Sequence, residues 1–187
     1  MQRSNDASSD LAAERVLIID FGSQFTQLIA RRVRESGVYC EIWPYNADPE
    51  RIAAYAASAI ILSGGPASVI EESSPRVPEA VFAAGVPVLG ICYGEQAMCA
   101  ALGGAVEAGH GREYGRATFQ LTEPSPLFAG AWELGACADV WMSHGDRVSR
   151  VPPGFRTIGT SANAPFAAIA DEARHYYGLM FHPEVVH

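Results

Sequence analysis

The chain has 187 residues, of which 49% are apolar and 18% are charged, and these proportions suit one compact domain with its own core. Its formal net charge of −8 at pH 7 disfavours non-specific binding to nucleic-acid backbones or anionic membrane surfaces. The longest nearly apolar run, residues 52–62, is shorter than the roughly 20 residues of a bilayer-spanning helix. The four cysteines form no Cys-x-x-Cys pair, which predicts free thiols and a cytoplasmic location.

Taken in chain order, the polar residues 1–14 predict a disordered tail, and residues 15–187 predict a single domain. Apolar strand-like runs then alternate with segments of helical periodicity. The predicted strands are 16–19, 39–43, 59–62 and 86–91, and the predicted helices are 25–33, 49–55, 76–84 and 95–102. This alternation predicts parallel βαβ units and an α/β fold. Short β-like stretches follow, at 117–121, 140–142, 156–159, 167–170 and 177–181, and predict a mixed or antiparallel remainder.

Cys92 lies where an apolar strand gives way to a predicted helix, with Gly90 two residues before it and Gly94 two residues after. This spacing is typical of a nucleophile elbow, in which the glycines avoid the Cβ clashes of a sharp strand-to-helix turn. The positive end of the following helix favours the reactive thiolate. A small buried structural cysteine fits the same five residues, so this pattern alone leaves both interpretations open.

A cysteine nucleophile needs a group that accepts and donates a proton, usually a histidine held by a carboxylate. Of the five histidines, His182 is the best candidate, because Pro183 favours an extended backbone in which Glu184 faces the same side. The pair follows the apolar run 177–181, and α/β sheets place their sites at such strand ends. The sequence therefore predicts a dyad of His182 and Glu184 near Cys92.

A rival base lies in the polar segment 141–146, which follows a predicted strand. His144 is its histidine, but Gly145 leaves the nearby Asp146 conformationally free, so no carboxylate two residues on is well placed to orient the ring. His182 is therefore preferred over His144.

A glycine pair follows the predicted strand 59–62. The N–H group of Gly64 or Gly65, together with that of Tyr93, would form an oxyanion hole for a tetrahedral intermediate. A plain tight turn would demand glycine at these positions equally, so the pair is compatible with both roles.

Two other chemistries are disfavoured. His-x-Glu also occurs in zinc deaminases, but the Pro-Cys-x-x-Cys pair that they need is missing from the sequence, so no metal is expected. The loop from Ser63 to Ser68 is superficially similar to the Ser-Gly-Gly loop of ATP pyrophosphatases. That loop usually has aspartate where Ala67 stands, and Pro66 removes an N–H that a phosphate would use.

Together these residues resemble the class I, triad-type glutamine amidotransferases, and the resemblance runs over residues 15–187. The general motifs are Gly-Gly-Pro at 64–66, Gly-x-Cys-x-Gly-x-Gln at 90–96 and Phe-His-Pro-Glu at 181–184. A second set of motifs resembles, within that family, the glutaminase domains of GMP synthases. These motifs are at 20–24, 111–115, 140–146 and 185–187.

The resemblance implies a flavodoxin-like fold, with a central mostly parallel sheet, helices on both faces and an antiparallel extension. It implies that Cys92 is the nucleophile, His182 the acid and base, and Glu184 its orienter. The N–H groups of Gly65 and Tyr93 would form the oxyanion hole. The implied substrate-binding residues are Gln96, Ser143, Gly145 and Asp146.

The implied reaction is hydrolysis of L-glutamine to glutamate and ammonia. The ammonia would aminate XMP in an ATP pyrophosphatase domain or subunit, which uses ATP and Mg²⁺; no cofactor is implied for residues 15–187. The family pattern runs on into that domain beyond Glu184, so we expect the synthetase activity to lie outside this chain. Neither nucleic acid nor membrane is an expected partner.

Two further function classes stay open. A flavodoxin-like cysteine hydrolase or peptidase would share the elbow but would not require Gln96 or the segment 143–146. A non-catalytic interaction domain would keep the fold with an unreactive Cys92.

Overall fold

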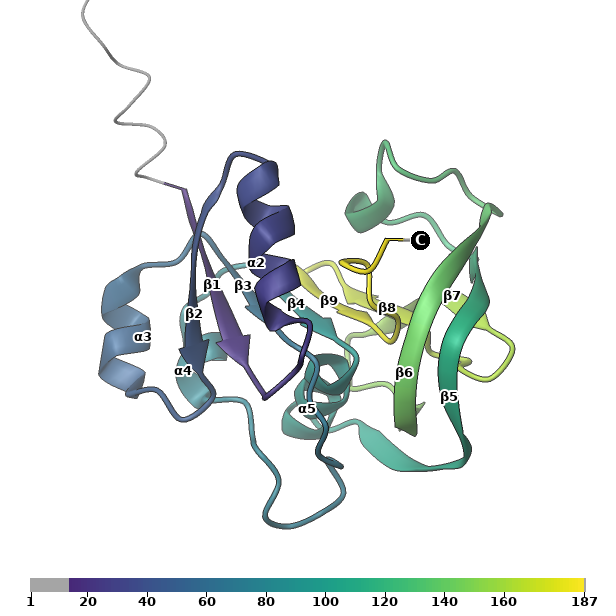
Figure 1. Cartoon of the computed structure of the whole chain (residues 1–187), viewed down its shortest axis with the longest axis horizontal. Coiled ribbons are helices and arrows are strands. Elements are labelled where there is room, and N and C mark those ends of the chain that lie inside the picture. Colours follow the sequence, from purple (N-terminus) through teal and green to yellow (C-terminus); the bar gives the residue numbers. More distant parts are fainter. Residues whose placement is uncertain (1–13, 187) are drawn as a thin grey trace, which may run out of the picture.

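The structure, a computed structural model, describes residues 14–186 (Figure 1). Most of the predicted tail, residues 1–13, and His187 lie outside the described residues. The strands are β1 (Arg15–Asp20), β2 (Tyr39–Pro44), β3 (Ala59–Leu62), β4 (Val88–Ile91), β5 (Ala105–Leu121), β6 (Cys137–Arg150), β7 (Arg156–Ser161), β8 (Ala168–Asp171) and β9 (Tyr176–Leu179). The helices are α2 (Thr26–Glu35), α3 (Pro49–Tyr55), α4 (Glu79–Ala83), α5 (Tyr93–Ala101) and the short 3₁₀ helix η1 (Pro126–Phe128).

These strands form one sheet in the order β2-β1-β3-β4-β9-β8-β7-β5-β6. The first five strands in this order pair in parallel, and the remaining pairings, from β9 to β6, are antiparallel. The parallel part has the strand order of flavodoxin-like sheets. The predicted α/β class with an antiparallel extension is therefore confirmed. Within residues 14–186, no helix is long and apolar enough to cross a membrane.

Both faces of the parallel part are covered, and β1 shows why its sequence is continuously apolar. Ile18 packs on one face with Ile29 of α2, while Leu17 and Ile19 belong to the larger core on the opposite face. The side chains of Leu17, Ile18 and Ile19 are all fully buried. A strand buried on both faces has no solvent-facing positions, so its sequence does not alternate.

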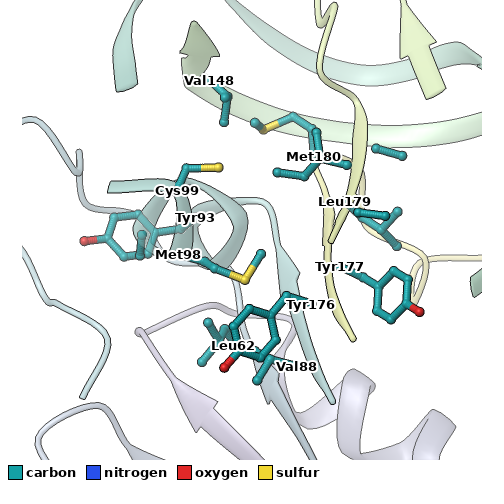
Figure 2. Close-up of a cluster of buried hydrophobic side chains, with 14 of the residues drawn as sticks. Leu62, Val88, Tyr93, Met98, Cys99, Val148, Tyr176, Tyr177, Leu179 and Met180 are labelled. Carbon is teal, nitrogen blue, oxygen red and sulfur yellow. The ribbon is translucent and has the colours of Figure 1, made fainter. Parts of the chain in front are cut away.

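Helix α5 packs deep inside this larger core. Figure 2 shows Tyr93, Met98 and Cys99 of α5 gathered with side chains from β3, β4 and β9. Met98 and Cys99 are fully buried. This packing fixes the start of α5, and therefore the turn that precedes it, against three parallel strands.

The predicted bounds differ from the observed ones mainly in the second half of the chain. β5 and β6 are long paired strands rather than the short stretches 117–121 and 140–142, because glycines that looked like turns lie inside an irregular antiparallel ladder. The predicted helix 76–84 is shorter, since it begins only after Pro78. Helix α5 begins at Tyr93, directly after the Cys92 turn, rather than at residue 95.

The glycines that flank Cys92 are required by close backbone approach. A Cβ on Gly94 would lie 2.3 Å from the carbonyl oxygen of Leu62, and one on Gly90 would lie 2.7 Å from the backbone N of Glu95. Real Cβ atoms essentially never approach backbone this closely. The predicted reason for both glycines is thus confirmed.

We expect Gly94→Ala to destabilise the protein by about 3 kcal/mol, a magnitude typical of overpacking, although alanine normally stabilises a helix by about 1 kcal/mol over glycine. The free energy of unfolding in urea measures the change. Gly37→Ala is the matched control, because Gly37 has φ of 79° but open space around its Cβ position, so only backbone strain of about 1 kcal/mol is expected. Equal losses in the two variants would contradict the steric explanation.

Candidate active site

The carboxyl ends of four parallel strands meet at one edge of the sheet and open into a pocket of about 750 Å³. The segments that follow β1, β3, β4 and β9 form one side of this pocket, and the ribbon of β5 and β6 forms the other. The lining residues include Ser23, Gly65, Ser68, Cys92, Tyr93, Gln96, Tyr114, Ser143, His144, Gly145, Asp146 and His182. Open α/β sheets bind ligands at this edge.

Cys92 has the backbone angles that the elbow pattern predicts. Its φ is 53° and its ψ is −110°, a conformation that a residue with a Cβ rarely adopts. The N–H of Cys92 donates to the carbonyl of Leu179 at 2.7 Å, and its Sγ lies 3.3 Å from the carbonyl oxygen of Ser143. The thiol therefore lies between β9 and β6, at the N-terminus of α5.

His182 and Glu184 form a buried pair in the segment after β9. Nδ1 of His182 lies 2.7 Å from Oε1 of Glu184, and each residue is 3% exposed. The ring of Phe25 packs edge-on against the imidazole, and Arg32 Nε donates to the Glu184 carbonyl at 3.3 Å. Phe25 and the Glu184 carboxylate thus contact the ring directly, and Arg32 holds the backbone of Glu184.

The protonation of His182 follows from its neighbours. Burial by itself lowers the pKa of His182, but hydrogen bonds with the Cys92 sulfur and the Glu184 carboxylate, together with their negative charges, outweigh it and raise the pKa to about 9. The imidazole is therefore protonated at neutral pH, with the Cys92 sulfur and the Glu184 carboxylate as its partners. Such a group can donate a proton to a leaving group and later accept one from water.

The predicted glycine pair lies beside this constellation. A Cβ on Gly64 would lie 3.1 Å from Cε1 of His182 and 3.7 Å from the Cβ of Cys92. A Cβ on Gly65 would lie 2.6 Å from the carbonyl oxygen of Phe21. Close packing therefore requires glycine at position 65 and leaves little room for a Cβ at position 64, which is compatible with the turn and with the oxyanion role.

The predicted substrate-binding residues gather on the pocket wall, but not in a loop. Ser143, Gly145 and Asp146 lie inside β6, so the prediction that their segment follows a strand is wrong. The Nε2 of Gln96 donates to the carbonyl of Asp146 at 2.9 Å, and Ser68 Oγ donates to the Asp146 carboxylate. Asp146 thus connects β6 to α5 and to the loop that follows β3.

One pocket feature was missed in the sequence. His144 does have a carboxylate partner, but it comes from β5: Oε2 of Glu113 lies 3.1 Å from Nε2 of His144. No local pattern indicates this pair, because Glu113 and His144 meet only through the β5–β6 register.

The other three cysteines lie away from the pocket, with Cys40 and Cys99 buried and Cys137 exposed. Within residues 14–186, no group of three or more His, Cys, Asp or Glu side chains is arranged to hold a metal ion.

The family model for class-I glutamine amidotransferases matches residues 17–187. The chain belongs to this family. It is 62% identical over 174 residues to proteins named "GMP synthase [glutamine-hydrolyzing]" from Allorhizobium ampelinum and Brucella melitensis biotype 1. The match covers 93% of this chain but 34% of each relative, so the chain spans about a third of their length.

Solved structures of amidotransferases share the fold. A protein from Thermoplasma acidophilum, described as one subunit of a GMP synthase, superposes with a TM-score of 0.78 at 26% identity, over 92% of this chain and 85% of that one. A glutamine amidotransferase from Thermotoga maritima superposes with a TM-score of 0.71 at 23% identity, over 92% and 77%. The flavodoxin-like amidotransferase fold implied by the sequence resemblance is therefore confirmed.

Glu95 is a buried acid three residues after Cys92, in the first turn of α5. It is fully buried in the first turn of α5, and neither carboxylate oxygen has a hydrogen-bond partner among the described residues. Gly178 of β9 makes room for it, since a Cβ there would lie 2.7 Å from Cγ of Glu95. Burial, and secondarily the negative charge of Cys92, raise the pKa of Glu95 well above its ordinary value of 4.5. Burial therefore favours the protonated form of Glu95.

This proton makes stability depend on pH. The folded chain keeps the Glu95 proton after the unfolded chain has lost it, so the stability contributed by the protonated form falls as pH rises above about 4.5 towards the folded pKa. We expect Glu95→Gln to remove this loss of stability, which amounts to up to roughly 1 kcal/mol per pH unit as the pH rises above about 5. Urea unfolding of both proteins across this range gives the slopes.

Glu79→Gln is the matched control, because Glu79 is an exposed acid in the first turn of α4. A wild-type slope equal to that of Glu95→Gln, or a Glu79→Gln variant that flattens the slope as much, would contradict the assignment of the buried proton to Glu95.

Proposed function

We propose that the chain hydrolyses L-glutamine to glutamate and ammonia through a thioester on Cys92. The observation that carries the proposal is the strained Cys92 turn, with the buried pair of His182 and Glu184 beside it. Family membership supports the choice of glutamine over a peptide or an ester. This substrate fits a pocket of about 750 Å³ whose polar lining includes side chains of α5 and β6.

The first half of the reaction forms the thioester. The Cys92 thiolate attacks the side-chain carbonyl carbon of glutamine, and the N–H groups of Gly65 and Tyr93 stabilise the oxyanion. As the C–N bond breaks, the protonated His182 gives its proton to the departing nitrogen, which leaves as ammonia. The raised pKa of His182, about 9, ensures that this proton is present at neutral pH.

The second half hydrolyses the thioester. The now neutral His182 accepts a proton from water, the resulting hydroxide attacks the carbonyl carbon, and the C–S bond breaks to release glutamate. Glu184 keeps the ring oriented through both steps, because its Oε1 lies 2.7 Å from Nδ1. We assign Gln96, Ser143, Gly145 and Asp146 to substrate binding, since all four line the pocket.

We further propose that the ammonia aminates XMP to GMP in an ATP pyrophosphatase domain or subunit, which uses ATP and Mg²⁺. The 62% identity to GMP synthases supports this use, and the part of those relatives that the chain does not match leaves room for such a domain. Free ammonia is protonated in water at neutral pH, so a glutaminase of this kind is expected to be slow until the acceptor is ready.

Cys92→Ala is expected to abolish glutamate release, by about a thousandfold or more, because no other thiol reaches the pocket of the described structure. Release of glutamate from glutamine is the measurement, and a glutamine-like diazo-ketone should label Cys92 alone. Cys137→Ala, which removes an exposed thiol outside the pocket, is the control and should stay active. Activity that survives in Cys92→Ala would overturn the proposal.

The use of the ammonia is tested by adding the part of the Allorhizobium ampelinum relative that this chain does not match, as a separate polypeptide. With XMP, ATP and Mg²⁺ we expect glutamate release to rise about tenfold or more and GMP to form, since a coupling energy of about 1–3 kcal/mol is typical. The Cys92→Ala chain is the control: GMP should then form from added ammonium but not from glutamine. Glutamate release unchanged by the complete mixture, without GMP, would contradict the coupling.

A further inference from the structure

Ser63 is a fully buried polar residue at the point where β3 ends and the glycine pair begins. Gly65 lines the pocket, whereas Ser63 lies outside its lining. The N–H of Ser63 donates to the Ile19 carbonyl of β1 at 3.0 Å, so the backbone here is still held by the sheet. Buried polar side chains almost always have hydrogen-bond partners, and the partners of the Ser63 hydroxyl indicate its role.

The Ser63 hydroxyl connects two backbone segments. Its Oγ accepts from the Phe21 N–H at 3.0 Å, directly after β1. It also donates to the carbonyl oxygen of Gly64 at 2.8 Å. The serine therefore ties the first residue of the glycine pair to the end of β1.

A second acceptor for the hydroxyl hydrogen lies farther away. Oδ1 of Asp20 is 3.5 Å from Ser63 Oγ. That oxygen already accepts from the Gly22 N–H and from the Thr26 hydroxyl, each at 2.8 Å. Because a hydroxyl has only one hydrogen, the shorter distance directs it to the Gly64 carbonyl.

The Gly64 carbonyl and the Gly65 N–H belong to the same peptide group. The described residues contain no cis peptide bond, so this carbonyl and this N–H point in opposite directions. The carbonyl is bound to the buried Ser63, and the Gly65 N–H therefore points away from Ser63. Among residues 14–186 this N–H donates to no backbone carbonyl, which leaves it available to a ligand in the pocket that Gly65 lines.

Phe21 relates this peptide group to the start of α5. Its N–H binds Ser63, and its carbonyl oxygen lies only 2.6 Å from the position of a Cβ on Gly65. Its ring packs against the ring of Tyr93, with 5.3 Å between the centroids. Phe21 therefore contacts both residues whose N–H groups are assigned to the oxyanion hole, and Ser63 holds its backbone.

We propose that Ser63 is a positioning residue of the oxyanion hole, whose hydroxyl fixes the peptide group between Gly64 and Gly65 so that the Gly65 N–H faces the substrate oxygen. The inference rests on the proposed function, because an oxyanion forms only where the side-chain carbonyl of glutamine is attacked. Ser63 itself touches no reacting atom. Its effect is on kcat rather than on KM, since the oxyanion exists in the tetrahedral states and not in bound glutamine.

The first test compares Ser63→Ala with Ser63→Thr in the full chain. Complete loss of one oxyanion donor typically lowers kcat by about 10²–10³, and a donor that is present but no longer fixed costs less. We therefore expect Ser63→Ala to lower kcat about tenfold or more, with KM for glutamine within about threefold of the wild type. Ser63→Thr keeps a hydroxyl on Cβ, so its kcat should stay within about threefold of the wild type.

Ser125→Ala is the matched control. Ser125 Oγ also binds a backbone N–H, that of Leu127 at 3.3 Å, but it lies outside the active-site pocket. Removing this cap should lower the free energy of unfolding by about 1 kcal/mol and leave kcat and KM unchanged. Loss of stability alone is thereby separated from loss of the oxyanion donor.

Alkylation by iodoacetamide separates the oxyanion hole from the thiol. The Cys92 sulfur forms its new S–C bond at a saturated carbon while the C–I bond breaks and iodide leaves, so no oxyanion develops. The rate of Cys92 labelling, followed by peptide mass, should therefore agree within about twofold between the wild type and Ser63→Ala. A labelling rate that falls as far as kcat would overturn the proposal, because the substitution would then act on the thiol.

Carbon NMR of the Gly64 carbonyl provides a readout that does not depend on activity. The signal of a carbonyl carbon responds to the hydrogen bond on its oxygen. It should shift in Ser63→Ala and stay in place in Ser63→Thr and Ser125→Ala.

Wild-type kcat in Ser63→Ala, or an equal loss of kcat in Ser63→Thr, would overturn the positioning role. Wild-type protein that hydrolyses no glutamine would instead overturn the proposed function, and with it the catalytic use of the Gly65 N–H. The Gly64 carbonyl signal would then still decide whether Ser63 holds this peptide group.

Discussion

The strained backbone at Cys92 is the constraint on which the rest of the site depends. A non-glycine residue at φ 53° persists only where its surroundings over-determine it. Here the Leu179 carbonyl of β9 binds the Cys92 N–H from one side, and the Leu62 carbonyl of β3 presses against Gly94 from the other. The two strands that hold the turn are also the strands that continue into the His182 segment and the glycine pair. One packing requirement therefore brings the thiol, the imidazole and the loop at Gly64 together.

The segments after the parallel strands line one part of the pocket, and the antiparallel ribbon of β5 and β6 lines another. Its residues lie on paired strands, whose ladder limits backbone movement more than an open loop would. Ser143 reaches the Cys92 thiol through its carbonyl, and Asp146 reaches Gln96 through its own. The ribbon is therefore part of the site's geometry, while the family-wide motifs at 90–96 and 181–184 lie on the parallel part.

How much of this could be predicted depends on the range of the interactions. The bounds of α3 and β3 were predicted to the residue, because local signals set them: Asp48 caps α3 with its side chain, and Pro49 occupies its first turn. The length of β5 and β6 was not predicted, since their glycines signal turns locally and become strand only through pairing. The partnership of Glu113 with His144 was out of reach for the same reason. Glu113 faces His144 only because the β5–β6 pairing resumes in a shifted register after the irregularity between Ala108 and Glu113. No short sequence pattern encodes such a shift.

Two buried acids near the thiol show how partners decide what a carboxyl does. Glu184 is 3% exposed but faces the His182 ring at 2.7 Å, whereas the fully buried Glu95 has no hydrogen-bond partner among the described residues. Burial disfavours the charged form of any unpaired carboxyl, so it favours the neutral form of Glu95, which adds no negative charge behind Cys92. A charged Glu95 would repel the thiolate that the proposed reaction requires. A neutral one leaves the thiolate and Glu184 on opposite sides of the His182 imidazolium, and this is the charge distribution that holds the pKa of His182 near 9 despite its burial.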